Sequence, residues 1–321
     1  MLRPLSAGVD MIIENALFFK FIKKYRLQNV YLFFWRKETF RGLLNFRRRI
    51  LLRRCYQEIR QRPDIALVTR ISQDLKMFGI AKCHITELED APSLELLQLE
   101  YEKLLNKENL TPHDRKSKSY IQRLVDDDYS FSAPESAIAK YLLNETVALS
   151  CALYLGVIPK LTSFKIWRSH QIEQSQREAS QNWHRDYNDY QMVRVFLYFN
   201  DVNSSNGAGD YVKGSHFLGD GFTKLQDSEN GISRYATDLG VSTEFSIDRI
   251  ITANGKAGTL YFLDTGGLHR GGYHTEPGER RVSLTTFSTS ADLQTSKIKS
   301  PKNFILNKGF FGIRSHVPIR N

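Results

Sequence analysis

The chain has 321 residues, of which 41% are hydrophobic and 25% charged, the ordinary composition of a globular protein with a substantial core. Its net charge of +10 is concentrated in residues 20–62, where fourteen Lys and Arg face two acids, a local net of +12, so the remainder sums to −2. Three widely spaced cysteines, Cys55, Cys83 and Cys151, exclude the usual zinc-binding patterns and favour a reducing compartment without structural disulfides.

Basic and aromatic side chains are interspersed through residues 11–62. The longest uncharged run there, residues 27–35, is far shorter than the ~20 apolar residues that span a bilayer. Three interpretations remain open: an amphipathic helix on an anionic membrane surface, a patch for nucleic acid or another polyanion, and a solvated flank. We favour the membrane surface over nucleic acid, and treat residues 1–62 as a basic, aromatic-rich helical arm.

The start of the chain lacks the apolar run and small-residue cleavage site of a secretory signal peptide. We therefore expect a cytoplasmic protein, with a peripheral position on the inner face of the membrane if the arm binds lipid.

The first half of the remaining chain shows mainly helical patterns. Apolar residues recur with helical spacing from Asp64 to Gly79 and from residue 94 to residue 105, and a glycine closes the first helix. A third helix is predicted from Pro134 to Leu155, with Ser132 as its N-cap and Gly156 closing it. A strand is expected over residues 80–85, and the polar stretch 107–119 is predicted to be an exposed connection.

After residue 159 the pattern changes to strands separated by glycine-bearing loops. Predicted strands cover residues 161–167, 192–199, 258–264 and 281–287, and a short strand runs into a turn over 210–216. Helices followed by many antiparallel strands predict an α+β chain with a β-sandwich or barrel core. We expect one domain over residues 63–321, preceded by the arm.

A His-x-Asp motif, His184-Arg185-Asp186, precedes the predicted strand 192–199. On extended backbone, residues two apart project from the same face, so the imidazole and the carboxylate point toward one place. One imidazole and one carboxylate are two-thirds of a metal site that leaves coordination positions open. By itself the motif is weak evidence, because such a pair is common by chance.

A third ligand should lie at or just beyond the end of a downstream strand. His269 fits, because it follows the strand 258–264 across a short turn. His274 is the competitor, five residues farther on. We favour His269 because it lies closer to the rigid strand that metal geometry requires.

An arginine that opens the strand after these histidines is a candidate anchor for an anion. Arg281 and Ser283 share one face of the predicted strand 281–287, and a carboxylate held by the guanidinium fork and the hydroxyl would satisfy both groups. Arg280 would point to the opposite face and is the alternative. We favour Arg281, because Ser283 supports that register.

Together, His184-x-Asp186, Gly214-Ser215-His216, His269 and Arg281-x-Ser283 resemble the phytanoyl-CoA dioxygenase family of Fe(II)/2-oxoglutarate oxygenases, over residues 160–290. The resemblance implies a double-stranded β-helix, or jelly-roll, core with the N-terminal helices packed on one side. It further implies that His184, Asp186 and His269 bind Fe(II). Arg281 and Ser283 would bind the far carboxylate of 2-oxoglutarate, and O2 would be the second co-substrate. Arg123 and Lys165 are the two candidates for a second basic contact to the co-substrate. Lys213 departs from the pattern, because relatives usually have proline there.

The resemblance implies hydroxylation of a C–H bond with release of succinate and CO2. The carboxylate of Asp186 disfavours halogenation, for which related enzymes have a small residue at this place. The substrate is expected to be a small molecule, a sugar or a lipid-linked compound, and the Kdo sugar of lipopolysaccharide is one candidate by similarity to Kdo hydroxylases. The alternatives are a non-catalytic jelly-roll module recruited through the basic arm, and a zinc hydrolase that uses the same three ligands.

Overall fold

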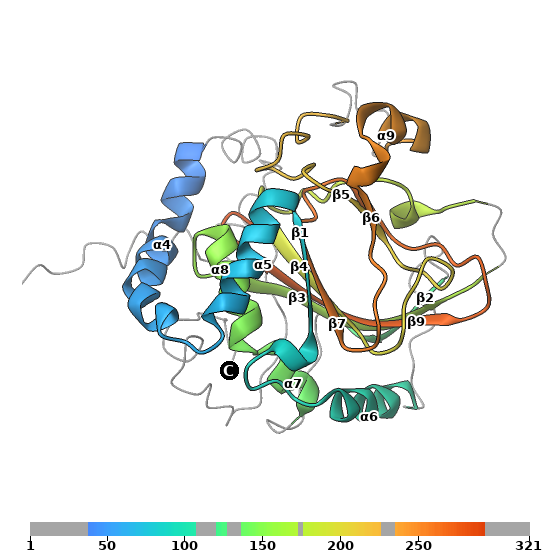
Figure 1. Ribbon diagram of the computed structural model, residues 1–321, viewed down its shortest axis with the longest axis horizontal. Helices are drawn as coiled ribbons and strands as arrows, with labels where there is room; N and C mark the ends of the chain where they lie inside the picture. The colour runs from blue at the N-terminus through green and yellow to red at the C-terminus, as the bar shows by residue number, and fades with distance from the viewer. Residues whose placement is uncertain (1–37, 107–119, 127–135, 173–175, 226–234, 293–321) are drawn as a thin grey trace, which may run out of the picture.

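The computed structural model describes residues 38–106, 120–126, 136–172, 176–225 and 235–292 (Figure 1). The helices are α4 (Glu38–Arg60), α5 (Ile65–Phe78), α6 (Leu94–Leu105), α7 (Ala137–Leu142), α8 (Glu145–Leu155) and α9 (Asp238–Glu244). The strands are β1 (Ile80–His84), β2 (Ile121–Val125), β3 (Lys160–His170), β4 (Met192–Tyr198), β5 (Asp210–Val212), β6 (Ile250–Thr252), β7 (Thr259–Leu263), β8 (His269–Arg270) and β9 (Glu279–Ser288).

The strands form two sheets. A six-stranded sheet has the order β1-β7-β4-β9-β3-β2, and a three-stranded sheet has the order β6-β5-β8. An antiparallel bridge between His184 and His269 adds the segment around His184 to the free edge of β8. From β3 to β9 the chain passes back and forth between the two sheets, which is the connectivity of a double-stranded β-helix. The expected α+β fold with a jelly-roll core is confirmed.

The alternation of residues along β4 separates two layers of packing. Val193, Val195 and Leu197 belong to the main hydrophobic core, which also contains buried residues of α5, α6, α7 and α8. Phe196 and Tyr198, which alternate with these residues along the strand, face the other way and pack in the space enclosed by the two sheets. Helices α5, α6, α7 and α8 therefore cover one face of the large sheet, as Figure 1 shows for α5 and α8, and the other face lines the interior of the barrel.

The helix predictions hold except at one position. Helices α5 and α6 occupy the predicted stretches, and Gly79 ends α5 in the left-handed conformation, at φ 75°. The single helix predicted up to Leu155 is two helices, because the side chain of Asn144 caps the amide of Val147 and starts α8 anew. Ser132, the expected N-cap, and the connection 107–119 lie outside the described residues.

Helix α4 belongs to the predicted arm, and its inner face joins the body of the protein. Leu52, Cys55 and Ile59 form a buried cluster with residues of α5 and α8 and with Ile158. All three cysteines are buried and unpaired. Within the described ranges, no helix has both the length and the hydropathy needed to cross a membrane.

Candidate metal centre

The three residues expected to bind a metal come together at the edge of the small sheet. His184 and His269 lie directly opposite each other, joined by two backbone hydrogen bonds of 2.8 and 3.0 Å, and their ring centroids are 4.3 Å apart. The amide of Asp186 donates to the carbonyl of Thr265 at 2.8 Å, which holds the residue beside the β7–β8 loop. One potential ligand atom from each of the three side chains lies within 4.8 Å of the others.

Backbone carbonyls select the tautomer of both histidines. The Nδ1 of His184 lies 2.8 Å from the carbonyl of Asn182, and the Nδ1 of His269 lies 2.9 Å from the carbonyl of Gly267. A carbonyl can only accept, so each Nδ1 carries the proton and each Nε2 keeps its lone pair. Each imidazole is thereby oriented as a metal ligand before any metal binds.

The charge states of these side chains also suit a divalent cation. Burial, reinforced by the neighbouring His184, lowers the pKa of His269 to about 3. Burial opposes ionisation of Asp186, but the nearby Arg194, His269 and His184 outweigh it and lower the pKa of this carboxyl to about 2. At neutral pH, His269 is therefore a neutral imidazole and Asp186 a carboxylate. Two imidazoles and one carboxylate on one side of an ion leave its other positions open.

Arg194 is a site residue that the sequence interpretation missed. It lies on β4, on the face shared with Phe196, and its Nη1 is 2.7 Å from Oδ2 of Asp186. The side chains of Arg194 and Asp186 are 24% and 15% exposed, so their ion pair is largely shielded from water. An arginine inside an otherwise apolar strand, Met192-Val193-Arg194-Val195, was the available signal.

The two candidate anchor arginines point in opposite directions from β9. Arg281 lies on the helix side, where its guanidinium forms ion pairs with Glu279 and with Glu102 of α6 and lies 5.5 Å from the ring centroid of Tyr101. Arg280 lies on the barrel side, with its guanidinium 5.7 Å from the ring centroid of Phe196.

This arrangement corrects the expected register. Strand β9 begins at Glu279, and its pairing with β3 and β4 turns Val282 into the barrel and Ser283 toward Tyr141 of α7. The structure therefore does not bring Arg281 and Ser283 together with the metal triad.

Arg280 is instead buried in the barrel and only partly satisfied. It is 9% exposed, its Nη1 donates to the carbonyl of Gly207 at 3.0 Å, and its Nε has no hydrogen-bond partner among the described residues. A buried guanidinium with an unused donor is costly unless an anion binds it.

His274, the competing ligand, is not part of the triad. Its Nε2 lies 3.1 Å from the hydroxyl of Ser169 on β3, and burial and the nearby Arg280 lower its pKa to about 4. His274 therefore lies beside Arg280, whereas His269 pairs with His184.

The residues on either side of His184 secure the loops around the site. Arg185 is 3% exposed and donates to the carbonyls of Ser215, Gly266 and Lys224, so it connects three loops. The hydroxyl of Ser215 in turn accepts the amide of Leu268 at 2.7 Å. The Gly-Ser-His turn thus supports the loop that carries His269, and His216 is not a member of the ligand group.

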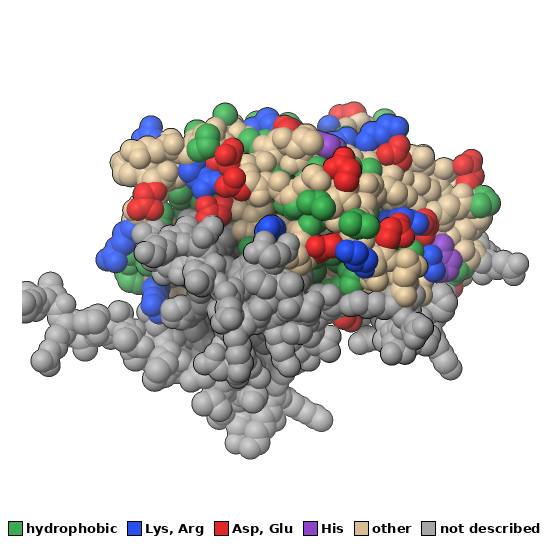
Figure 2. Space-filling model, turned by 90° about the horizontal axis from the view of Figure 1, so that it is seen from below, with side chains coloured by type: hydrophobic (Ala, Val, Ile, Leu, Met, Phe, Trp, Pro, Cys, Tyr) green, Lys and Arg blue, Asp and Glu red, His purple; other side chains and the backbone are tan. Residues whose placement is uncertain are grey.

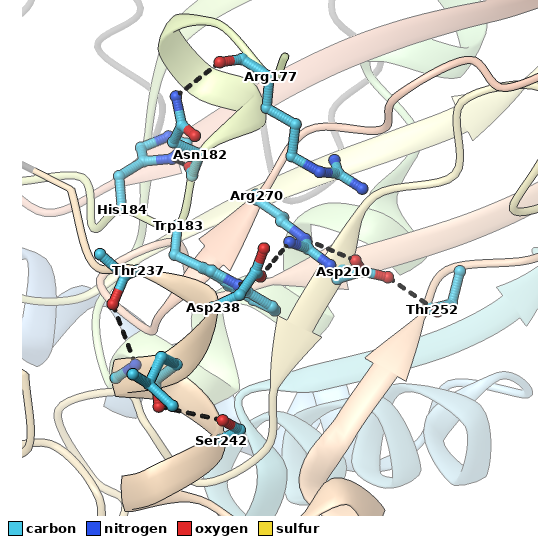
Figure 3. A network of polar contacts seen from close by, with 12 residues as sticks. Arg177, Asn182, Trp183, His184, Asp210, Thr237, Asp238, Ser242, Thr252 and Arg270 are labelled. Carbon is cyan, nitrogen blue, oxygen red and sulfur yellow. Dashed lines mark hydrogen bonds and ion pairs between the residues drawn. The ribbon is translucent and has the colours of Figure 1, made fainter. Parts of the chain in front are cut away.

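Trp183 fixes the outer side of the small sheet. Its indole nitrogen donates to Asp238 at 2.8 Å, and the guanidinium of Arg270 lies 4.4 Å above its ring. Arg270 also bonds Asp210 at 2.7 Å and Asp238 at 2.6 Å, as Figure 3 shows beside His184. Because Trp183 and Arg270 adjoin His184 and His269 in the chain, this network holds the backbone that positions both imidazoles.

Two further basic residues lie on the barrel side of the large sheet. Arg123 on β2 is paired with Trp167 of β3, and Lys165 lies two residues before that tryptophan. Both contact Asp126, Arg123 at 2.5 Å and Lys165 at 3.4 Å. They are the residues that the sequence suggests as further contacts for an anionic co-substrate.

Comparison with known proteins supports the fold. No family model matches the sequence, and no curated protein matches it. Among solved structures, the chain is similar to the non-heme α-ketoglutarate-dependent epimerase SnoN from nogalamycin biosynthesis, with a TM-score of 0.53, 14% identity, and coverage of 70% of this chain and 84% of SnoN.

A second structure, of SnoN in complex with Fe3+, α-ketoglutarate and nogalamycin RO, gives a TM-score of 0.50 at 16% identity with the same coverage. At this level of identity the similarity establishes a shared fold. The chain therefore has the jelly-roll fold of SnoN, with a His-Asp-His group inside it.

Proposed function

We propose that the chain is an Fe(II)/2-oxoglutarate-dependent dioxygenase that hydroxylates a C–H bond and releases succinate and CO2. The observation that carries the proposal is the combination, inside one barrel, of an open-sided His-Asp-His group and a buried arginine with an unused donor. A zinc hydrolase could use the same three ligands, but it has no need for the buried arginine.

His184, Asp186 and His269 would hold the iron, and their backbone contacts would keep both imidazole Nε2 atoms directed at it. Bound iron supplies the oxidising power for C–H hydroxylation, with O2 and 2-oxoglutarate as co-substrates. The carboxylate of Asp186 would occupy a coordination position that a halogenase leaves for chloride, which favours hydroxylation.

We further propose that Arg280, and not Arg281, binds the far carboxylate of 2-oxoglutarate. Arg280 shares the barrel interior with Arg194, whereas Arg281 is engaged by two glutamates on the other face. A carboxylate on Arg280 would satisfy the free Nε and neutralise a buried charge.

The two arginines make a matched pair for a test. Anaerobic addition of Fe(II) and then 2-oxoglutarate should produce the weak visible charge-transfer band of the iron chelate, and His184→Ala should abolish it. Arg280→Ala should weaken 2-oxoglutarate binding by about 100-fold, as expected for loss of a buried charged partner, while Arg281→Ala should leave it within about twofold. Absence of the band in the wild-type protein would contradict the oxygenase proposal. If Arg280→Ala and Arg281→Ala weakened 2-oxoglutarate binding equally, Arg280 would not be the anchor.

The proposed substrate is a small molecule, a sugar or a lipid-linked compound, with the Kdo sugar of lipopolysaccharide as one candidate. SnoN was crystallised with nogalamycin RO, which supports a small organic substrate for this fold. The basic arm supports a lipid-linked substrate at an anionic surface, and the three buried free thiols agree with a reducing, cytoplasmic compartment. Succinate release measured across candidate sugars and lipids would identify the substrate.

The alternative function is a non-catalytic jelly-roll module recruited through the basic arm. A module without chemistry has no need for paired, tautomer-fixed histidines beside an ionised carboxylate. Formation of the chelate band together with succinate release would reject this alternative.

A further inference from the structure

The outer face of α4 differs in character from its inner face. Between residues 41 and 60 five arginines are exposed, and the one exposed acid is Glu58. The exposed arginines are Arg47, Arg49, Arg53, Arg54 and Arg60. Three exposed apolar side chains lie on the same helix: Leu43 at 59%, Phe46 at 60% and Tyr56 at 48% exposure. Figure 2 shows Lys and Arg side chains along the left edge of the molecule, the edge where α4 lies in Figure 1.

The inner face of α4 is firmly attached to the body of the protein. Besides the buried cluster around Leu52, the Nη1 of Arg48 donates to the carbonyl of Ile158 at 3.2 Å, and Asn45 accepts the amide of Ser290 at 2.8 Å. A helix held on one side presents its other side as a rigid surface, so the exposed arginines and apolar residues keep a fixed arrangement.

The same helix contacts the loop that follows the metal ligand Asp186. The guanidinium of Arg41 lies 3.9 Å above the ring of Tyr190, four residues after Asp186, and 5.4 Å from the ring of Phe217. Anything that binds the outer face of α4 is therefore held in a fixed relation to the metal centre.

We propose that the outer face of α4 docks on an anionic phospholipid membrane, with the helix lying in the plane of the interface. Arginines would contact the lipid phosphates while Leu43, Phe46 and Tyr56 enter the headgroup region. This combination of arginines and apolar side chains favours lipid over nucleic acid, because a nucleic-acid backbone offers no apolar region in which exposed leucine and phenylalanine side chains could be buried. The inference names the surface at which the proposed oxygenase would meet a lipid-linked substrate, and to that extent rests on the proposed function.

Vesicle binding tests the charge contribution. The full chain should sediment with phosphatidylcholine vesicles that contain roughly 30% phosphatidylglycerol, but not with vesicles of pure phosphatidylcholine. Binding to the anionic vesicles should weaken as the NaCl concentration rises. Removing one near-surface cation weakens binding by about fivefold, so Arg53→Gln with Arg54→Gln should weaken it about 25-fold. Lys103→Gln with Lys256→Gln removes two exposed charges elsewhere and should leave it within about twofold.

A second pair of variants tests the apolar contribution. Leu43→Ser with Phe46→Ser should reduce vesicle binding by about tenfold or more even at high salt, because the loss is of apolar area. Leu239→Ser with Ile247→Ser is the matched control, since these side chains are 77% and 82% exposed on a different part of the surface. Equal loss in test and control variants would overturn the proposal.

Three other results would also overturn it: binding to neutral vesicles as strong as to anionic ones, no binding to either, or α4-dependent binding to RNA without binding to vesicles. The assay needs no turnover and is therefore independent of the oxygenase assignment. Vesicle binding without a 2-oxoglutarate band would retain the docking surface and reject the oxygenase, and the opposite combination would reject only the docking surface.

Discussion

At the scale of single residues, the metal site depends on which histidine lies opposite His184. His269 does, through reciprocal backbone hydrogen bonds, while His274 contacts Ser169 on the other sheet. The sequence indicated His269 through its closeness to the preceding strand, and that argument selected the residue that the structure places beside His184 and Asp186.

Exchanging either histidine for alanine should separate their roles. His269→Ala removes one of the three proposed ligands and should weaken Co(II) or Fe(II) binding by at least about 100-fold. His274→Ala leaves the triad intact, so metal affinity should stay within about threefold. Competition with a chromophoric chelator measures both, and a similar loss in the two variants would contradict the assignment of His269.

The choice between Arg280 and Arg281 depends on more than the residues themselves. Whether Arg280 or Arg281 points into the barrel depends on the register of β9 against β3 and β4, and a shift of one residue exchanges the two faces. Ser283 suggested a polar, ligand-facing side, but it is a buried residue packed against the helix layer. Local pattern alone cannot fix a register that long-range pairing sets.

At the scale of elements, the junction between α5 and β1 depends on a glycine. Gly79 has φ 75°, and a Cβ there would lie 2.2 Å from the hydroxyl of Tyr211 and 2.7 Å from Nδ1 of His216. Gly156, which ends α8 at φ 68°, has open space around the same position. The sequence predicted both helix ends from the glycines, but the crowding at Gly79 comes from residues more than 130 positions away.

These two glycines permit a controlled measurement of backbone strain and crowding. Gly156→Ala should destabilise the protein by about 1–2 kcal/mol, the cost of a left-handed alanine. Gly79→Ala adds displacement of Tyr211 and His216 and should cost roughly 3 kcal/mol or more. Urea denaturation monitored by fluorescence would give both values. Equal unfolding midpoints for the two variants would show that Tyr211 and His216 move aside at little cost in free energy.

At the scale of the whole molecule, the pKa shifts of the aspartates fall into two groups with opposite effects on stability. Burial raises the pKa of both Asp189 and Asp264 to about 7. The pKa values of Asp64 and Asp238 shift the other way. Burial opposes ionisation of Asp64, but Arg62 and Thr146 outweigh it and lower its pKa, and hydrogen bonds and arginine partners lower the pKa of the exposed Asp238.

These shifts predict how stability depends on pH. Between about pH 4 and pH 7 the folded state keeps protons on Asp189 and Asp264 that the unfolded chain has released, so these two groups contribute stability that falls as pH rises. The lowered pKa values of His269 and His274 give the opposite slope up to about pH 6.5, so the two contributions largely offset each other in the whole protein. The carboxyls with lowered pKa add stability above about pH 4 and lose it only below. Melting temperatures of the wild-type protein and of Asp264→Asn from about pH 4.5 to 7.5 test the direction, because the stability of the wild type relative to the variant should fall as pH rises. A difference that grows with pH would contradict the raised pKa of Asp264.

The attachment of α4 makes a second prediction at this scale. Leu52 is 7% exposed in the cluster that joins α4 to α5 and α8, whereas Leu43 is 59% exposed. Leu52→Ala should therefore cost about 2–4 kcal/mol of global stability and Leu43→Ala less than about 0.5 kcal/mol. If Leu52→Ala were equally silent in thermal unfolding, α4 would be a separable arm, as composition alone suggests.

The reciprocal backbone hydrogen bonds between His184 and His269 have a consequence for how a metal would bind. Folding itself orders these two imidazoles, since the backbone amide and carbonyl of His184 are hydrogen-bonded to the carbonyl and amide of His269. Metal capture then requires little loss of chain entropy, and the association should proceed in a single kinetic phase limited by dehydration of the ion. The amides of His184 and His269 should accordingly exchange slowly with deuterium before metal is added, and change little afterwards.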